Sequence, residues 1–106
     1  MNTIVSLHGF TGESADFDLV REFLPAHARL NAPDLPGHGS RRHQRDLRDY
    51  SVEAHLALIS EAATSPQITL MGYSLGGRLA LHWALAHPER IARLILIGAS
   101  PGLATP

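Results

Sequence analysis

Short, uniformly apolar runs alternate along the chain with longer segments in which apolar residues recur every three or four positions. The short runs lack the alternation of a half-exposed strand, and their Val, Ile and Leu content is typical of strands buried on both faces. We therefore predict strands at residues 3–7, 28–32, 68–72 and 91–97. Because helical segments separate them, the pattern predicts an α/β fold with a parallel sheet and helices on both faces.

Three segments between these runs carry the signals of helices. Residues 14–24 and residues 75–87 place apolar side chains at helical spacing, and a proline follows each. Because a proline cannot continue a helix, each proline marks a helix end. Ser51 is suited to cap the remaining helix, which carries an apolar face as far as Ala63. The segment at 75–87 is apolar on most sides, so we expect it to pack deep against the sheet.

Length and composition indicate one globular domain over residues 1–106. A chain of 106 residues can bury roughly 65% of its unfolded surface, and 44% hydrophobic with 18% charged residues excludes wholesale disorder. The formal net charge of −1 argues against general nucleic-acid binding. All nine basic residues are Arg, and four of them lie within residues 40–49. That stretch could contact an anion, but the offsetting Asp46 and Asp49 favour a solvated loop.

Neither the N-terminus nor any internal run has the features of a targeting or membrane segment. Met1–Phe10 lacks a basic leading region and a cleavage-site pattern, and no apolar run approaches the roughly 18 residues of a membrane span. The chain has no Cys, which excludes disulfides and thiolate metal sites and is compatible with the cytosol. We therefore expect a cytoplasmic protein that binds neither membranes nor nucleic acid.

The segment Gly72-Tyr73-Ser74-Leu75-Gly76 fits G-x-S-x-G, the pattern of a nucleophile elbow, and lies directly between a predicted strand and a predicted helix. Such a sharp turn forces the serine into a strained backbone conformation, and the flanking glycines remove side chains that would collide there. The hydroxyl would then project above the strand ends, near the positive end of the helix. A serine that merely caps the helix is the alternative, but the strand, the helix and both glycines favour a nucleophile.

An oxyanion hole needs two backbone N–H groups that point at one oxygen. The residue after the nucleophile, Leu75, would supply one of them. The loop after the first strand, His8-Gly9-Phe10, occupies the position of the other, with Phe10 as the donor and Gly9 allowing a close approach. His8 could act as a general base, but its position at the end of the strand favours a buried, hydrogen-bonded structural role.

The chain resembles the N-terminal part of the α/β-hydrolase fold family in four phrases that occur in the family's order: LHGFTG, APDLPGHGS, MGYSLGG and an apolar strand after HPERI. The resemblance covers residues 4–100 and implies a sheet in which the first and third strands are central neighbours. Within the family, the phrases DLPGHG, GYSLGGRLAL and ASPGL are similar to lyases of menaquinone biosynthesis, which eliminate pyruvate to form 2-succinyl-6-hydroxy-2,4-cyclohexadiene-1-carboxylate. In those enzymes the Tyr before the nucleophile and the Arg four residues after it contact the substrate, which implies these roles for Tyr73 and Arg78.

The residues themselves are compatible with these roles. Arg78 lies one helical turn after Ser74, so both side chains can face one cavity, where a guanidinium could hold a carboxylate through two hydrogen bonds. An exposed Arg paired with a nearby acid is the alternative, and the resemblance favours the substrate-binding role. Tyr73 has a competing role in packing the elbow. Asp34 and His38 flank the turn after the second strand, and we expect them to anchor that loop.

The catalytic acid and base of this fold follow the nucleophile along the chain, in the order Ser, Asp or Glu, His. Here Asp34, Asp46 and Asp49 precede Ser74, and two histidines of the following helix point away from its start. The chain therefore looks like a fragment without the cap region and the C-terminal part, and the acid and base would lie beyond Pro106. A serine without a base is a weak nucleophile, so we expect the chain alone to be inactive.

We also expect the uncovered sheet edge of such a fragment to favour self-association.

Three functions stay open at this point. The first is elimination of pyruvate, with Ser74, assisted by a His, starting the proton abstraction; Arg78 and the ASPGL phrase favour it. The second is a serine esterase or C–C bond hydrolase, in which Ser74 attacks a carbonyl and forms an acyl-enzyme. The third is an inactive fragment or a non-enzymatic relative. We expect a small anionic or ester substrate, no metal ion and no cofactor.

Overall fold

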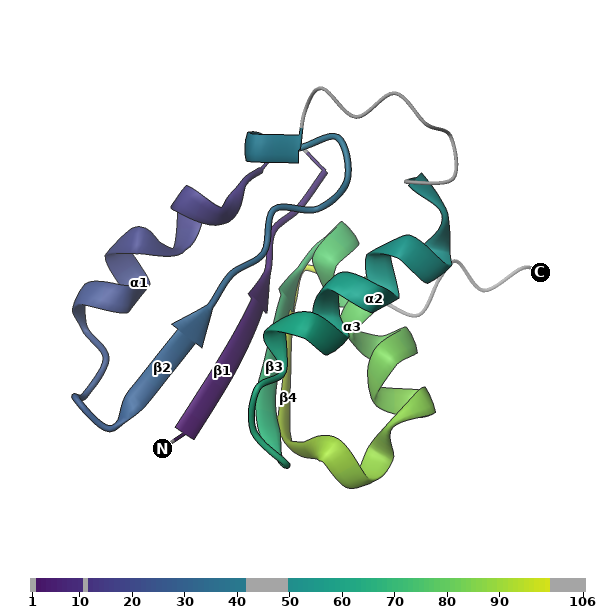
Figure 1. Ribbon diagram of the computed structural model, residues 1–106. Coiled ribbons are helices and arrows are strands. Elements are labelled where there is room, and N and C mark those ends of the chain that lie inside the picture. The colour runs from purple at the N-terminus through teal and green to yellow at the C-terminus, as the bar shows by residue number, and fades with distance from the viewer. Residues whose placement is uncertain (1, 11, 42–49, 100–106) are drawn as a thin grey trace.

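The computed structural model describes residues 2–10, 12–41 and 50–99, and within them four strands form one sheet. The strands are β1 (Asn2–Leu7), β2 (Ala28–Asn31), β3 (Ile68–Tyr73) and β4 (Ile91–Ile97). Their order is β2-β1-β3-β4, and every adjacent pair is parallel (Figure 1). The predicted strands, their parallel pairing and the central position of the first and third strands are confirmed.

Helices cover both sides of this sheet, as predicted. The helix α1 (Asp18–Glu22) lies on one side, and α2 (Val52–Ala62) and α3 (Leu75–Ala86) lie on the other (Figure 1). The Ser51 hydroxyl accepts a 3.0 Å hydrogen bond from the Ala54 N–H, so Ser51 caps α2 as expected. Short 3₁₀ turns add η1 (Ser14–Phe17), η2 (Gly39–Arg41) and η4 (Pro88–Arg90). The rest of the arginine-rich stretch, residues 42–49, lies outside the described residues.

The single helix predicted at residues 14–24 is wrong in its extent. The segment is divided into the turn η1 and the short helix α1. Of its apolar side chains Phe17 is buried, whereas Val20 and Phe23 are exposed. The first N–H of η1 donates a 2.7 Å hydrogen bond to the Asp34 carboxylate in a neighbouring loop. That bond ties the tight first turn to the loop, and α1 has little apolar surface to pack against.

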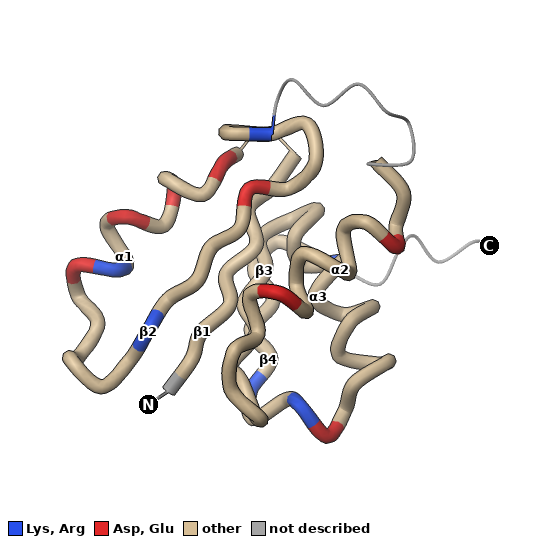
Figure 2. The backbone as a smooth tube through the Cα atoms, viewed as in Figure 1, with Lys and Arg blue, Asp and Glu red and all other residues tan. Residues whose placement is uncertain are grey.

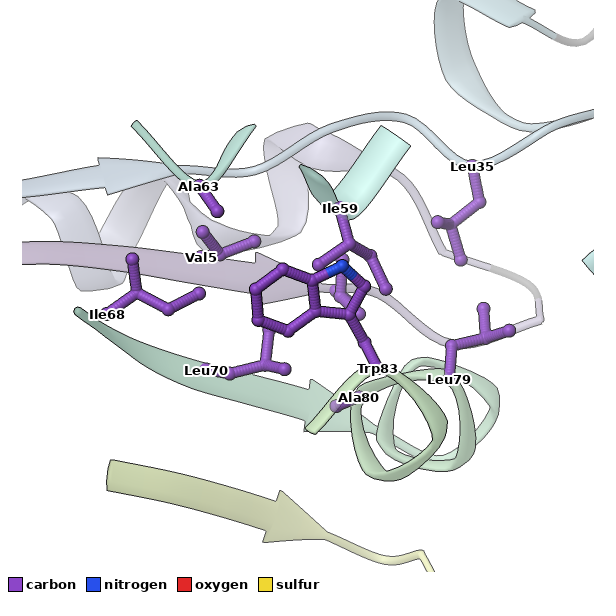
Figure 3. Close-up of a cluster of buried hydrophobic side chains, with 10 residues drawn as sticks. Val5, Leu35, Ile59, Ala63, Ile68, Leu70, Leu79, Ala80 and Trp83 are labelled. Carbon is purple, nitrogen blue, oxygen red and sulfur yellow. The ribbon is translucent and has the colours of Figure 1, made fainter. Parts of the chain in front are cut away.

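One hydrophobic cluster fills the space between the sheet and the pair α2 and α3 (Figure 3). Successive strand residues point to opposite faces, so β1 contributes Val5 to this cluster and β3 contributes Leu70. Trp83 of α3 is 1% exposed, and its indole N–H donates a 3.0 Å hydrogen bond to the Ser60 hydroxyl of α2. Burying one large apolar side chain contributes about 1.5–3 kcal/mol, so this cluster is the main source of stability.

The strand β4 is less well covered than the central strands. Its Leu94 packs against the cluster, but Ile95 and Ile97 point to the other face and are exposed. Leu85, on the outer face of α3, is also exposed, so α3 is packed less completely than its composition predicts. The edge strand β4 therefore exposes apolar surface among the described residues.

Charged residues lie along α1, in loops, on α2 and α3 and on the edge strands β2 and β4, while the central strands β1 and β3 carry none (Figure 2). This distribution follows from the cost of burying a charge without a partner. In the part of the chain that the structure describes, no helix is long and apolar enough to cross a membrane.

Arg90, in the turn before β4, makes three hydrogen bonds to one connection of the fold. Its guanidinium donates hydrogen bonds to the carbonyl oxygens of Pro66 (2.7 Å), Ser65 (2.9 Å) and Ala63 (3.0 Å). It also lies 5.7 Å from the centroid of the Trp83 ring, within the range of a cation–π interaction. Arg90 therefore links the α2–β3 connection to the turn that delivers β4.

We predict that Arg90→Lys destabilises the fold by about 1–3 kcal/mol, because an ammonium cannot satisfy three carbonyl oxygens with the geometry of a guanidinium. Urea unfolding followed by circular dichroism measures the change. The matched control is Arg93→Lys on β4, where the side chain is exposed and has no hydrogen bond or ion pair within the described residues. Equal losses in the two variants would contradict the role assigned to Arg90.

Candidate active site

Ser74 occupies the sharp turn between β3 and α3. Its backbone has φ 53° and ψ −113°, and it is the one non-glycine residue with positive φ among the described residues. This region is sparsely populated because the side chain crowds the backbone. Hydrogen bonds hold the conformation, since the Ser74 N–H donates to the Ile97 carbonyl at 2.9 Å and the Arg78 N–H donates to the Ser74 carbonyl at 3.2 Å. The strained backbone predicted for the nucleophile elbow is confirmed.

The flanking glycines are required by close approach of the backbone. A Cβ at Gly72 would lie 2.3 Å from the Gly76 carbonyl oxygen, and a Cβ at Gly76 would lie 2.3 Å from the Leu7 carbonyl oxygen. Real side chains do not approach backbone oxygens so closely, so α3 could not begin where it does with alanine at either position. The elbow therefore depends on contact between the first turn of α3 and the end of β1.

A cavity of about 600 Å³ lies beside the elbow. Ser74, Leu75 and Arg78 form its wall on the α3 side, and Phe10 contributes from the loop after β1. Gly98 and Ala99, just after β4, complete the lining. Sequence reasoning missed this last pair, although the carboxyl ends of adjacent parallel strands meet at one edge of a sheet. Four of the five predicted site residues thus line one cavity.

The geometry of Phe10 and Leu75 suits the predicted oxyanion hole. Neither backbone N–H has a protein acceptor among the described residues. In the peptide unit that carries the Phe10 N–H, the Gly9 carbonyl oxygen accepts from His8 Nδ1 at 2.8 Å and from the Gly12 N–H at 3.0 Å. The N–H at the opposite side of this planar unit is therefore directed away from those donors. The Leu75 N–H lies at the start of α3, where the helix dipole favours an anion.

His8 has the structural role expected for it. Its ring is buried, and Nε2 accepts a 3.0 Å hydrogen bond from the Leu35 N–H, so the ring proton resides on Nδ1 and is donated to Gly9. Burial lowers the pKa of His8, which keeps the ring neutral. With both nitrogens engaged in this way, His8 has no free lone pair to accept a proton from Ser74.

Arg78 and Tyr73, the two predicted substrate-binding residues, are placed differently. Arg78 is exposed and lines the cavity, and its guanidinium has no hydrogen bond or ion pair within the described residues. The Tyr73 ring lies between the loop that contains Gly9 and the turn that contains Gly98. A Cβ added at Gly9 would lie 3.0 Å from the ring, and a Cβ added at Gly98 would lie 3.6 Å from it. Tyr73 does not line the cavity, so its geometry matches the packing alternative, and a role toward substrate stays a prediction.

Asp34 anchors its loop, as expected. One carboxylate oxygen accepts from the Ser14 N–H at 2.7 Å, and the other accepts from the N–H and hydroxyl of Ser40 at 3.0 and 2.8 Å. Partial burial raises the pKa of Asp34, but these hydrogen bonds outweigh burial and hold its pKa below the usual value. His38, which bonds to two backbone carbonyls, is the second anchor.

Acid–base partners for Ser74 are absent from the described part of the cavity wall. None of the described His, Asp or Glu residues lines it. The described residues also contain no group of three or more His, Asp or Glu side chains that could hold a metal ion. The cavity thus presents Ser74, two backbone donors without an acceptor among the described residues, and the Arg78 guanidinium.

Comparisons with known proteins agree with this geometry. The sequence profile of the alpha/beta hydrolase fold matches residues 2–106, so the chain belongs to the α/β-hydrolase fold family. It is 38% identical over 103 residues to a 2-succinyl-6-hydroxy-2,4-cyclohexadiene-1-carboxylate synthase of Enterobacter sp. (strain 638), covering 94% of the chain and 38% of that protein. It is 36% identical over 98 residues to a pimeloyl-[acyl-carrier protein] methyl ester esterase of Nitrosomonas europaea, covering 92% of the chain and 37% of that protein.

Among solved structures, MenH from S. aureus superimposes with a TM-score of 0.80 at 31% identity, covering 98% of the chain and 40% of that protein. The chain therefore spans about two fifths of the length of the relatives it matches. The sequence resemblance and the fold class are confirmed, and the relatives include both a synthase and an esterase.

We predict that Ser74→Gly makes the fold about 1 kcal/mol more stable than Ser74→Ala does. Glycine adopts positive φ without steric penalty, whereas alanine retains the strain that costs about 1–3 kcal/mol, and the larger entropy of an unfolded glycine offsets part of the gain. Urea denaturation of the two variants measures the difference. Equal or reversed stability would show that the turn is not strained.

We predict that Asp34→Asn destabilises the fold by about 1–3 kcal/mol at neutral pH, because an amide cannot accept all three hydrogen bonds. The pKa of Asp34 is lower in the folded chain than its ordinary value of 3.8, so its contribution is complete above that value. The stability that the Asp34 carboxylate contributes is lost as the pH falls through its pKa in the folded chain. The curves of unfolding free energy against pH for the wild type and Asp34→Asn should converge there. Asp18→Asn, in an exposed ion pair with Arg21, is the control and should change stability little. A difference that is independent of pH would contradict the role of the carboxylate.

Proposed function

We propose that this chain carries the nucleophile side of an enzyme that eliminates pyruvate from an anionic cyclohexene carboxylate, forming 2-succinyl-6-hydroxy-2,4-cyclohexadiene-1-carboxylate. The observation that supports this most directly is Arg78, an exposed guanidinium without a protein partner in the described part, in the same cavity wall as Ser74. An unpaired Arg beside a reactive group is suited to bind a carboxylate through two hydrogen bonds. The similarity to a synthase of this name supports the same substrate class.

The proposed reaction breaks one C–H bond and one C–O bond of the substrate. A base removes a ring proton, the electron pair of that bond forms the new ring double bond, and the C–O bond to the three-carbon group breaks. The departing enolate takes up a proton and leaves as pyruvate. Ser74 would take part in the proton abstraction, relayed by a His from outside the described residues.

The remaining groups of the cavity would lower the barrier electrostatically. Negative charge that develops on a substrate oxygen could be stabilised by the free N–H groups of Phe10 and Leu75. Donors that are already oriented need no reorganisation during the reaction, and each such donor is worth about a hundredfold in rate. Arg78 would hold the substrate carboxylate so that the reacting bonds lie over Ser74.

A serine esterase is the second candidate, and the similarity to a methyl ester esterase favours it. In this reaction the Ser74 Oγ attacks the ester carbonyl, the oxyanion binds to the two N–H groups, and the alcohol leaves to give an acyl-enzyme that water hydrolyses. The two candidates share every group except Arg78, which an uncharged ester does not need. An inactive fragment or non-enzymatic relative is the third candidate, supported by the lack of an acid–base partner in the described cavity wall.

In an enzyme that combines this chain with a proton-accepting His, we predict that Arg78→Ala lowers turnover of the anionic substrate roughly 30- to 1,000-fold. This range corresponds to an Arg–carboxylate interaction of about 2–4 kcal/mol in the transition state. Hydrolysis of a neutral ester should be nearly unchanged, and Ser74→Ala should abolish both activities. Steady-state kinetics with both substrates measures the effects, with Arg93→Ala, outside the cavity, as control.

Equal losses on both substrates in Arg78→Ala would assign the Arg a structural role and favour the esterase. Activity of Ser74→Ala would reject the nucleophile. The 106-residue chain by itself should show neither activity, and measurable turnover by it would place the base within this chain.

A further inference from the structure

The end of β4 belongs to the cavity wall, yet little packing of its own holds it in place. Among the described residues β4 pairs with β3 alone, and the last three side chains of β4 are all exposed. The chain then turns at Gly98, which has φ 59°, and Gly98 and Ala99 line the cavity together with Ser74. A wall made from the end of an edge strand needs a contact with a neighbouring element to fix its position.

Such a contact joins Ala99 to the first turn of α3. A Cβ added at Gly77 would lie 2.3 Å from the Ala99 Cβ, so the Ala99 methyl occupies the space that a side chain at position 77 would need. Gly77 is buried and Ala99 is half-buried. Because protein interiors are close-packed, a methyl group that fits against a glycine in this way sets the separation of the two backbones.

The strand end that Ala99 contacts α3 from also carries the acceptor for the strained serine. The Ser74 N–H donates a 2.9 Å hydrogen bond to the carbonyl of Ile97, two residues before Ala99. The other hydrogen bond at the elbow, from the Arg78 N–H to the Ser74 carbonyl, belongs to the first turn of α3 and does not involve β4. We propose that Ala99 is a positioning residue: its methyl, packed against Gly77, holds the end of β4 so that the Ile97 carbonyl accepts from Ser74 and fixes the elbow beside the cavity.

This role deepens the proposed function, and it rests on that function where it takes Ser74 as the reacting residue. The contact needs one methyl group between the two backbones, and that methyl could be supplied from either side. With glycine at 99, the nearest remaining neighbour of a Cβ at 77 is the Gly72 carbonyl oxygen at 3.2 Å, a distance that a shift of a few tenths of an ångström relieves. Removal of the Ala99 methyl should therefore be harmful beside Gly77 and favourable beside an alanine at 77.

The test measures hydrogen exchange of the Ser74 N–H in the ¹⁵N-labelled chain by nuclear magnetic resonance, without any turnover. After correction for intrinsic exchange, we expect exchange in Ala99→Gly to be about tenfold faster than in the wild type, because the hydrogen bond to β4 opens locally. The Leu35 N–H, which is bonded in the loop after β2, reports the rest of the fold and should be unchanged. Ala92→Gly, at an exposed position of the same strand, is the matched control and should leave Ser74 exchange unchanged.

Moving the methyl group across the contact supplies the sharper comparison. Gly77→Ala should speed Ser74 exchange about tenfold or more, since the added Cβ has no room beside Ala99. The double variant Gly77→Ala with Ala99→Gly should return to within about threefold of the wild type. The same change at 99 then speeds exchange in one background and slows it in the other, which a general loss of stability does not produce. If Gly77→Ala does not fold, recovery of folding in the double variant takes the place of recovered exchange.

Equal Ser74 exchange in the wild type and Ala99→Gly would overturn the inference, as would an equal acceleration in Ala92→Gly or an equal acceleration at Leu35. A double variant that stays as impaired as Gly77→Ala would also overturn it. Activity that survives in Ser74→Ala would reject the proposed function alone, because none of these exchange rates depends on catalysis.

Discussion

The close approach of α3 to the end of β1 is the constraint on which the site depends. Gly76, in the first turn of α3, lies so close to the Leu7 carbonyl that no side chain fits between them. This approach brings the elbow beside the loop that follows β1, so Ser74 and Phe10 come to line the same cavity. The geometry of the candidate site is thus set by backbone packing between two elements, and the side chains of the cavity are added to it.

Features that arise from local sterics and apolar pattern could be predicted from the sequence. The four strands follow from their composition, and the positive φ of Ser74 follows from a serine placed between a strand, a helix and two glycines. The position of Tyr73 could not be predicted, because its ring is placed by Gly9 and Gly98, which are distant in sequence. The weak burial of α1 was equally hidden, since helical spacing of apolar residues does not reveal whether a surface is available to cover them.

The two histidines of the neighbouring loops show why residue type alone does not define a chemical role. The ring of His8 lies between a backbone donor and a backbone acceptor, whereas His38 lies between two acceptors. Hydrogen-bond partners, which depend on the folded chain, decide what an imidazole at a given position can donate or accept. A motif can therefore place a histidine near a site without showing whether it is a base, a donor or a structural element.

Parallel pairing of the central strands has a consequence for how the site is assembled in time. Ile4 of β1 pairs with Thr69 of β3 across most of the chain length, so a large loop must close before these strands meet. Topologies dominated by such distant pairings fold slowly. Until β1 arrives, the first turn of α3 has no Leu7 carbonyl to pack against. The cavity, which needs Phe10 from the loop after β1, is therefore expected to form late, together with the sheet.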